Sequence, residues 1–141
     1  MAWNEYIPSS EITDKVTEKT VLFAECFGGY LGKDDFIPLA AGKSQKISKL
    51  TTNQLRKFFG EVKRQQLQGY NDSSFVMLKP KLAYAVGRAD KNNKIVDFYK
   101  VISEAMSHVR NESQFRNFVQ IFEAIVAYHK AAEMGVDIKI K

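Results

Sequence analysis

Two stretches in the second half of the chain repeat apolar residues with the period of an amphipathic helix. The first stripe contains Ile95, Phe98, Tyr99, Ile102, Ala105, Met106 and Val109, and the second contains Phe115, Phe118, Val119, Phe122, Ile125, Val126 and His129. Between them, Asn111 and Gln114 have a spacing like that of a capping box, which marks a helix start. The short connection predicts an antiparallel helical hairpin.

A third apolar stripe lies in the middle of the chain and consists of Leu55, Phe58, Phe59 and Val62. It follows Thr51 and Gln54, another pair with capping-box spacing, and predicts a helix near residues 52–68. Further along, Pro80 fits the first turn of a helix because its fixed φ suits that position. The preceding residues 75–78, FVML, fit either a short strand or a continued helix.

Near the start of the chain, Ser9 or Ser10 can cap a helix that carries Val16, Val21, Leu22 and Cys26. The GGYLG stretch at residues 28–32 has no strand before it, so we interpret its glycines as the helix end and not as a phosphate loop. Residues 33–50 mix Pro38, Gly42 and lysines without a sustained period, which predicts a long basic loop. We expect residues 135–141 to form a flexible tail.

Together these patterns predict an all-α fold with a single helical domain over residues 1–141. About five helices should form a bundle, near residues 10–29, 52–68, 80–90, 93–109 and 112–133. Its buried core should contain Leu55, Phe58, Phe59, Val62, Phe98, Ile102, Phe118, Phe122 and Ile125.

The composition is that of an ordinary globular protein, with 45% hydrophobic and 26% charged residues in a chain of 141. No apolar run approaches the roughly 20 residues needed to cross a bilayer. The first residues, MAWNEYIPSS, lack the basic and apolar regions of a signal peptide, so we expect a cytoplasmic protein without membrane contact. The single Cys26 has no cysteine partner for a disulfide or a zinc site and should be a small buried hydrophobe.

Charge is distributed unevenly and changes this picture. Residues 43–100 carry thirteen Lys/Arg against four Asp/Glu, whereas residues 1–42 carry three against seven. Clustered basic charge of this kind is typical of proteins that bind polyanions, including nucleic acids. A lysine-rich face that only contacts solvent is the simpler alternative.

The cations of the central helix fall on its polar side. Successive helical residues lie about 100° apart, which places Arg56 close to Lys63, and Lys57 close to Arg64 about 100° further round. In the following helix, Lys81 and Arg88 lie two turns apart on one face. We expect these six cations to form one basic surface on the folded bundle.

The order LTTNQLRKFFGEVKR, LKPKLAYAVGR and an amphipathic hairpin resembles the small helical subunit of type III-A CRISPR effector complexes, the Csm complexes. The resemblance covers roughly residues 48–130. It implies a helical bundle without a catalytic site, which takes part in antiviral defence as copies stacked along guide RNA and target RNA within a ribonucleoprotein. It also implies that the partners are these RNAs, other subunits of the complex and copies of the same chain.

Matched onto this chain, the basic positions of the family fall on Arg56, Lys57, Lys81 and Arg88. The helix faces add Lys63, Arg64 and Lys79, and the helix start adds Asn53, because free backbone N–H groups there favour an anion. Thr52 shares that helix-start position. The predicted RNA-binding residues are therefore Asn53, Arg56, Lys57, Lys63, Arg64, Lys79, Lys81 and Arg88. They should contact phosphates and not bases, since the guide sequence varies.

Two aromatic residues are candidates for contacts with bases. Tyr84 could stack on a base, but we interpret a tyrosine within LAYAV as packed against a neighbouring helix. Phe36, in the predicted loop, should be less constrained.

Other functions fit the same sequence. A helical adaptor would bind proteins through exposed apolar residues, without RNA. The small subunit of the type III-B complexes has similar size and helicity. In isolation we expect a monomer or a weak dimer, because the stacking surfaces would meet only along RNA.

Catalysis finds little support in the sequence. His108 and His129 lie in separate helices without metal-ligand spacing, and a partly buried, hydrogen-bonded imidazole is the commoner outcome for His129. The adjacent Asp34 and Asp35 favour turn chemistry over an acid/base pair. A cluster of distant carboxylates, such as Asp90, Asp97 and Glu123, stays open as a nuclease site. We predict no enzyme activity, no metal and no cofactor.

Overall fold

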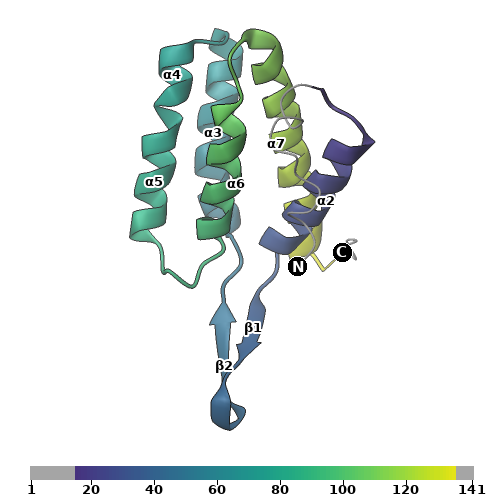
Figure 1. Cartoon of the computed structure of the whole chain (residues 1–141), viewed down its shortest axis with the longest axis vertical. Coiled ribbons are helices and arrows are strands. Elements are labelled where there is room, and N and C mark those ends of the chain that lie inside the picture. Colours follow the sequence, from purple (N-terminus) through teal and green to yellow (C-terminus); the bar gives the residue numbers. More distant parts are fainter. Residues whose placement is uncertain (1–14, 136–141) are drawn as a thin grey trace.

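The computed structural model describes residues 15–135, and within them long helices pack side by side (Figure 1). Phenylalanines make up much of the core between them. The helices are α2 (Glu18–Leu31), α3 (Thr52–Gln68), α4 (Asp72–Val76), α5 (Leu78–Arg88), α6 (Ile95–Ser107) and α7 (Glu112–Glu133). The predicted all-α bundle is confirmed. The bounds of α3 and α7 are close to those that the sequence predicts.

Side-chain caps explain why two of these helices begin where they do. Thr51 accepts a hydrogen bond from the backbone N–H of Gln54, whose side-chain oxygen accepts one from the backbone N–H of Thr51 at 2.8 Å. Asn111 accepts from the backbone N–H of Gln114 at 2.9 Å in the same way. The two predicted helix starts are confirmed, because each cap satisfies N–H groups that the helix leaves unpaired.

The core is built mainly from aromatic rings. Phe122 of α7 lies 5.4 Å from Phe58 of α3 and 5.7 Å from Phe98 of α6, measured between ring centroids. All nine residues predicted for the core lie in it or against it, and eight of them are buried. Phe59 is the exception: it is half-buried, although its ring stacks on Phe122 at 5.4 Å.

Helices α2 and α7 make the most extensive helix pair of the bundle, and a glycine permits their close approach. A Cβ atom built on Gly28 would lie 2.7 Å from the backbone oxygen of Ile125. Gly32 is the C-cap of α2, as predicted for the end of this helix, whereas Gly28 lies inside it. The prediction of a first helix near residues 10–29 that carries Val16 is wrong at its start, because α2 begins only at Glu18 and Thr17, in extended backbone, is its N-cap. Ser9, Ser10 and residues 136–141 of the predicted tail lie outside the described residues.

The segment expected to be a long loop over residues 33–50 is instead a β-hairpin. Strand β1 (Asp35–Pro38) pairs antiparallel with β2 (Ser44–Ile47), and the hairpin projects from one end of the bundle (Figure 1). Ala41 and Gly42 take positive φ in the connection. The sequence does not predict these strands because each is only four residues long and mostly exposed. Burial of one face therefore does not impose an alternation of apolar and polar residues on them.

A buried lysine fixes the base of this hairpin. Lys94, only 1% exposed, donates to the backbone oxygen of Tyr30 at 2.7 Å and pairs with the Asp35 carboxylate at 3.0 Å. Burial lowers the pKa of Lys94, while the hydrogen bond to Asp35 opposes that effect. The adjacent Asp34 accepts a bond from the backbone N–H of Lys49 at 2.8 Å. The predicted turn chemistry of the two aspartates is therefore wrong, since Asp35 lies in β1 and both side chains bind residues distant in the chain.

The ambiguous residues 75–78 are helical, since α4 ends at Val76 and α5 begins at Leu78. Pro80 lies in the first turn of α5, as predicted. Over residues 15–135, no helix is both long enough and apolar enough to cross a membrane.

Candidate nucleic-acid interface

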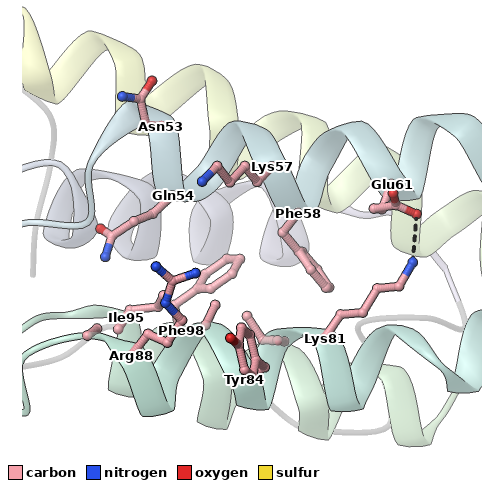
Figure 2. A pocket seen from close by; sticks show the side chains of 13 residues that line it. Asn53, Gln54, Lys57, Phe58, Glu61, Lys81, Tyr84, Arg88, Ile95 and Phe98 are labelled. Atoms are coloured by element: carbon pink, nitrogen blue, oxygen red, sulfur yellow. Dashed lines mark hydrogen bonds and ion pairs between the residues drawn. The ribbon is translucent and has the colours of Figure 1, made fainter.

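A groove of about 550 Å³ lies between α3 and α5 (Figure 2). Its floor is apolar and includes the buried side chains of Phe58, Leu82, Ile95 and Phe98. Its rim carries polar and charged groups of both helices: Asn53, Gln54, Lys57 and Glu61 from α3, and Lys81, Tyr84 and Arg88 from α5. We call this site the α3–α5 groove.

Helical spacing places the cations of the groove. Lys81 and Arg88 are seven residues apart, so they lie on one side of α5 with Tyr84 between them (Figure 2). On α3, Lys57 faces them across the gap. Leu78 and Leu82 hold α5 against the core by the opposite side of the helix. Lys57, Lys81 and Arg88 therefore converge, as the sequence analysis expects for part of its basic surface.

Among residues 15–135, Glu61 is the single carboxylate that lines the groove. One of its oxygens lies 2.6 Å from the Arg64 guanidinium and 3.2 Å from Lys81 Nζ. Hydrogen bonds from Arg64 and then from Lys81 hold the pKa of Glu61 below its ordinary value. Two cations thus share one carboxylate, which leaves the site positive. Lys57 forms no ion pair with any described residue.

Tyr84 differs from its prediction. The interpretation of this residue as packed against a neighbouring helix is wrong, because the side chain is 68% exposed. Tyr84 lies about 200° round the helix from the buried Leu82, which turns it away from the core. The guanidinium carbon of Arg88 lies over its ring, 5.7 Å from the centroid.

The other flank of α3 faces α7 and holds Arg56 and Lys63, whereas Arg64 pairs with Glu61. Lys63 Nζ pairs with Glu123 of α7 at 3.2 Å. Arg56 lines a separate cavity of about 210 Å³ with Val126 and Lys130 of α7. The expected single basic surface is therefore divided in two. The division follows from the 100° between the two cation pairs of α3, since α5 lies beside one pair and α7 beside the other.

The helix start of α3 is only partly available to an anion. The hydroxyl of Thr52 donates to the Glu133 carboxylate, which also lies 3.7 Å from Lys49 Nζ. Asn53 lines the α3–α5 groove. Lys79, in the first turn of α5, does not line it and pairs with no described carboxylate. The N-terminal position that Thr52 was expected to offer a phosphate is thus taken by a protein carboxylate.

Among the groove residues, sequence reasoning misses Glu61 and assigns Tyr84 to the wrong role. Glu61 follows Lys57 by one helical turn and precedes Arg64 by three residues, a spacing that predicts ion pairs and could have been used. Tyr84 was named but assigned to packing. Neither histidine contributes, because His129 is buried with its ring nitrogen 2.6 Å from the Leu50 oxygen and His108 lies 3.5 Å from Glu104. The described residues contain no cluster of three metal-ligating side chains.

Comparison with known proteins supports the resemblance found in the sequence. The model of one family, described as Csm2 Type III-A, matches residues 35–134. This match includes the hairpin, the α3–α5 groove and all of α7. Neither a curated protein nor a solved structure matches the chain.

Proposed function

The chain belongs to the Csm2 family, whose members are small subunits of type III-A CRISPR complexes, and we propose that it binds RNA through the α3–α5 groove. In this proposal the subunit is non-catalytic. Family membership places it among the other subunits of such a complex. It also favours type III-A over the type III-B alternative.

One observation carries the assignment of the groove. Lys57 of α3 meets Lys81 and Arg88 of α5 around one apolar-floored groove, although the two helices are separated in the chain. Three lining cations against one carboxylate give a local excess of positive charge. Phosphates are the ligands that such an arrangement recognises, by charge and by the bidentate geometry of arginine.

Contact with phosphates suits a subunit that must accept every guide. Phosphates are identical along guide RNA and target RNA, and cations that neutralise them release counterions whatever the base sequence. Copies of the subunit can therefore stack along the strands in the cytoplasm without reading them. The chain acts as a scaffold on which the bundle core fixes the position of the groove.

The test replaces Lys57 and Arg88 together by alanine in the reconstituted complex. We expect affinity for target RNA to fall equally for unrelated sequences, and the slope of log K against log salt to lose roughly 0.7 for each lost contact with a single strand. Arg56→Ala with Lys63→Ala removes the same charge from the other flank and is the matched control. Full affinity and an unchanged slope in the groove variant, with its fold intact, would refute the assignment.

A second candidate function is adhesion between subunits through the β-hairpin. Phe36, Ile37 and Leu39 are 63%, 46% and 50% exposed there, which is unusual for large apolar side chains in one short segment. We propose that another subunit of the complex covers them. Phe36→Asp with Leu39→Asp should then reduce incorporation into the complex without changing the RNA salt slope. Normal incorporation of this variant would rule the hairpin out.

A further inference from the structure

Beyond phosphate contacts, we propose that Tyr84 forms a stacking platform for one base of a single RNA strand whose phosphates lie on the rim of the α3–α5 groove. This inference rests on the proposed function, because it places the strand in the same groove. It adds a ligand moiety, the nucleobase, and a residue with a distinct role.

The exposure of Tyr84 is the first observation. Its side chain is 68% exposed, whereas Tyr30, Tyr70, Tyr99 and Tyr128 are all partly buried and pack against the core. The core therefore gains nothing from this ring. A large aromatic group held open in a basic groove is the feature that proteins use to stack bases of single strands.

The surroundings of the ring are the second observation. Lys81 and Arg88 lie one turn to either side of Tyr84, about 10 Å apart along the axis of α5. Both line the same groove as the ring (Figure 2). A base on Tyr84 would have its two flanking phosphates near these cations. Arg88 already lies over the ring at 5.7 Å, so a guanidinium, a ring and a base can form one stack.

The shape of the groove supports the same ligand. Leu82, Phe58 and Phe98 give an apolar floor beside the ring, and the Glu61–Lys81 ion pair spans the groove at one end (Figure 2). An apolar floor does not bind a charged phosphate, but the face or edge of a base can pack against it. Stacking of this kind tolerates any sequence.

The experiment is a double-mutant cycle with the full chain at low salt. Wild-type protein and Tyr84→Ala are each titrated with fluorescein-labelled oligouridylate and with an abasic oligomer of equal length and phosphate count. We expect Tyr84→Ala to weaken binding of oligouridylate by about fivefold or more, the range of base–aromatic stacking. Wild-type protein should bind the abasic oligomer more weakly than oligouridylate by a similar factor. Tyr84→Ala should not lower the affinity for the abasic oligomer any further.

Two control variants make the result specific. Tyr84→Phe keeps the ring and should keep the affinity, whereas loss in this variant would show a hydroxyl contact and contradict stacking. Leu67→Ala removes an apolar side chain that is 88% exposed outside the groove and should have no effect. The salt slope of Tyr84→Ala should equal that of wild-type protein, since no phosphate contact is removed.

Failure of this inference is separable from failure of the proposed function. If Tyr84→Ala binds both oligomers like wild-type protein while the Lys57/Arg88 variant loses affinity and slope, stacking is wrong and phosphate binding stands. An equal loss on both oligomers would also overturn stacking. If wild-type protein binds neither oligomer at low salt, the inference falls, and the proposed function is decided by the reconstituted complex alone.

Discussion

The two flanks of helix α3 both carry basic residues but face different neighbours. Toward α7, Phe59 stacks on Phe122, Lys63 pairs with Glu123, and Thr52 donates to Glu133. Toward α5, the same helix borders an open groove in which Lys81 and Arg64 share the single carboxylate of Glu61.

The difference shows that basic residues on one helix need not serve one purpose. On the α7 flank, Lys63 is paired with a carboxylate and the Phe59 ring is stacked on another ring, so these contacts mainly hold the bundle together. On the α5 flank positive charge exceeds negative charge and an aromatic ring stays exposed, so the flank is suited to a ligand. Four predictions test this division, from the largest expected effect to the smallest.

The largest effect should come from the aromatic stack behind the α7 flank. Phe122 is 1% exposed and contacts the rings of Phe58, Phe59, Phe98 and Phe118. Phe122→Ala should lower the free energy of unfolding by about 3 to 5 kcal/mol, because it leaves a cavity in a packed core. Chemical denaturation followed by circular dichroism measures this.

The matched substitution on the other flank is Tyr84→Ala. It removes an exposed ring from the α5 side, so the free energy of unfolding should change by less than about 0.5 kcal/mol. A cost at Tyr84 comparable to that at Phe122 would contradict the assignment of the two flanks.

The second prediction compares a glycine whose Cβ position is blocked by a neighbouring helix with a glycine that has free space there. Gly28→Ala should lower the free energy of unfolding by about 1 to 3 kcal/mol, because its new Cβ would lie 2.7 Å from the Ile125 oxygen and 2.8 Å from Tyr128 Cβ. Gly60 lies inside α3 with nothing within 4 Å of a built Cβ. Gly60→Ala should therefore stabilise the protein by roughly 0.5 to 1 kcal/mol. Thermal melting distinguishes the two signs, and destabilisation at both positions would be the opposing result.

Strong periodicity explains which elements could be predicted. The apolar stripes of α6 and α7 and the caps Thr51 and Asn111 depend only on residues close in the sequence. They can therefore be recognised without knowing which helices pack together. The hairpin has no buried face to impose alternation on its four-residue strands. The buried ion pair of Lys94 could not be seen either, because its partners Asp35 and Tyr30 meet it only in the folded chain.

The site was predicted in part for a related reason. A helical wheel correctly separates the Arg56/Lys63 pair from the Lys57/Arg64 pair, but it does not say which neighbour lies beside each pair. The exposure of Tyr84 was open to the same analysis, since Leu78 and Leu82 define the buried side of α5. Which cations a carboxylate neutralises depends on tertiary contacts, as Lys63 with Glu123 shows.

The third prediction sharpens the comparison by removing a carboxylate from each flank of α3. Glu61→Gln releases Lys81 and Arg64, so RNA affinity of the complex should rise and the salt slope should steepen by roughly 0.7 if one more phosphate contact forms. Glu123→Gln releases Lys63 on the α7 flank and should leave both quantities unchanged. Filter binding at several salt concentrations provides the measurement. Equal gains in the two variants would mean that both flanks contact RNA.

The smallest effect concerns how the two flanks respond to acid. The pKa of Glu61 is lowered chiefly by the hydrogen bond from Arg64, and that of Glu133 chiefly by the hydrogen bond from Thr52. Because both folded pKa values lie below the ordinary 4.5, their stabilisation is complete above that pH and is lost as pH falls through the folded values.

The partners differ in charge, and salt should therefore separate the two contributions. Each glutamate is partly exposed to solvent, so its contribution should be about 0.2 to 1 kcal/mol after screening. Glu61→Gln should reduce the loss of unfolding free energy on acidification only at low salt, because high salt already screens the Arg64 and Lys81 charges. Glu133→Gln should keep most of its effect at high salt, because its chief partner, the Thr52 hydroxyl, is neutral and salt screens only the weaker attraction of Lys49. Urea unfolding across the acid range at two salt concentrations tests this, and equal salt sensitivity in the two variants would contradict it.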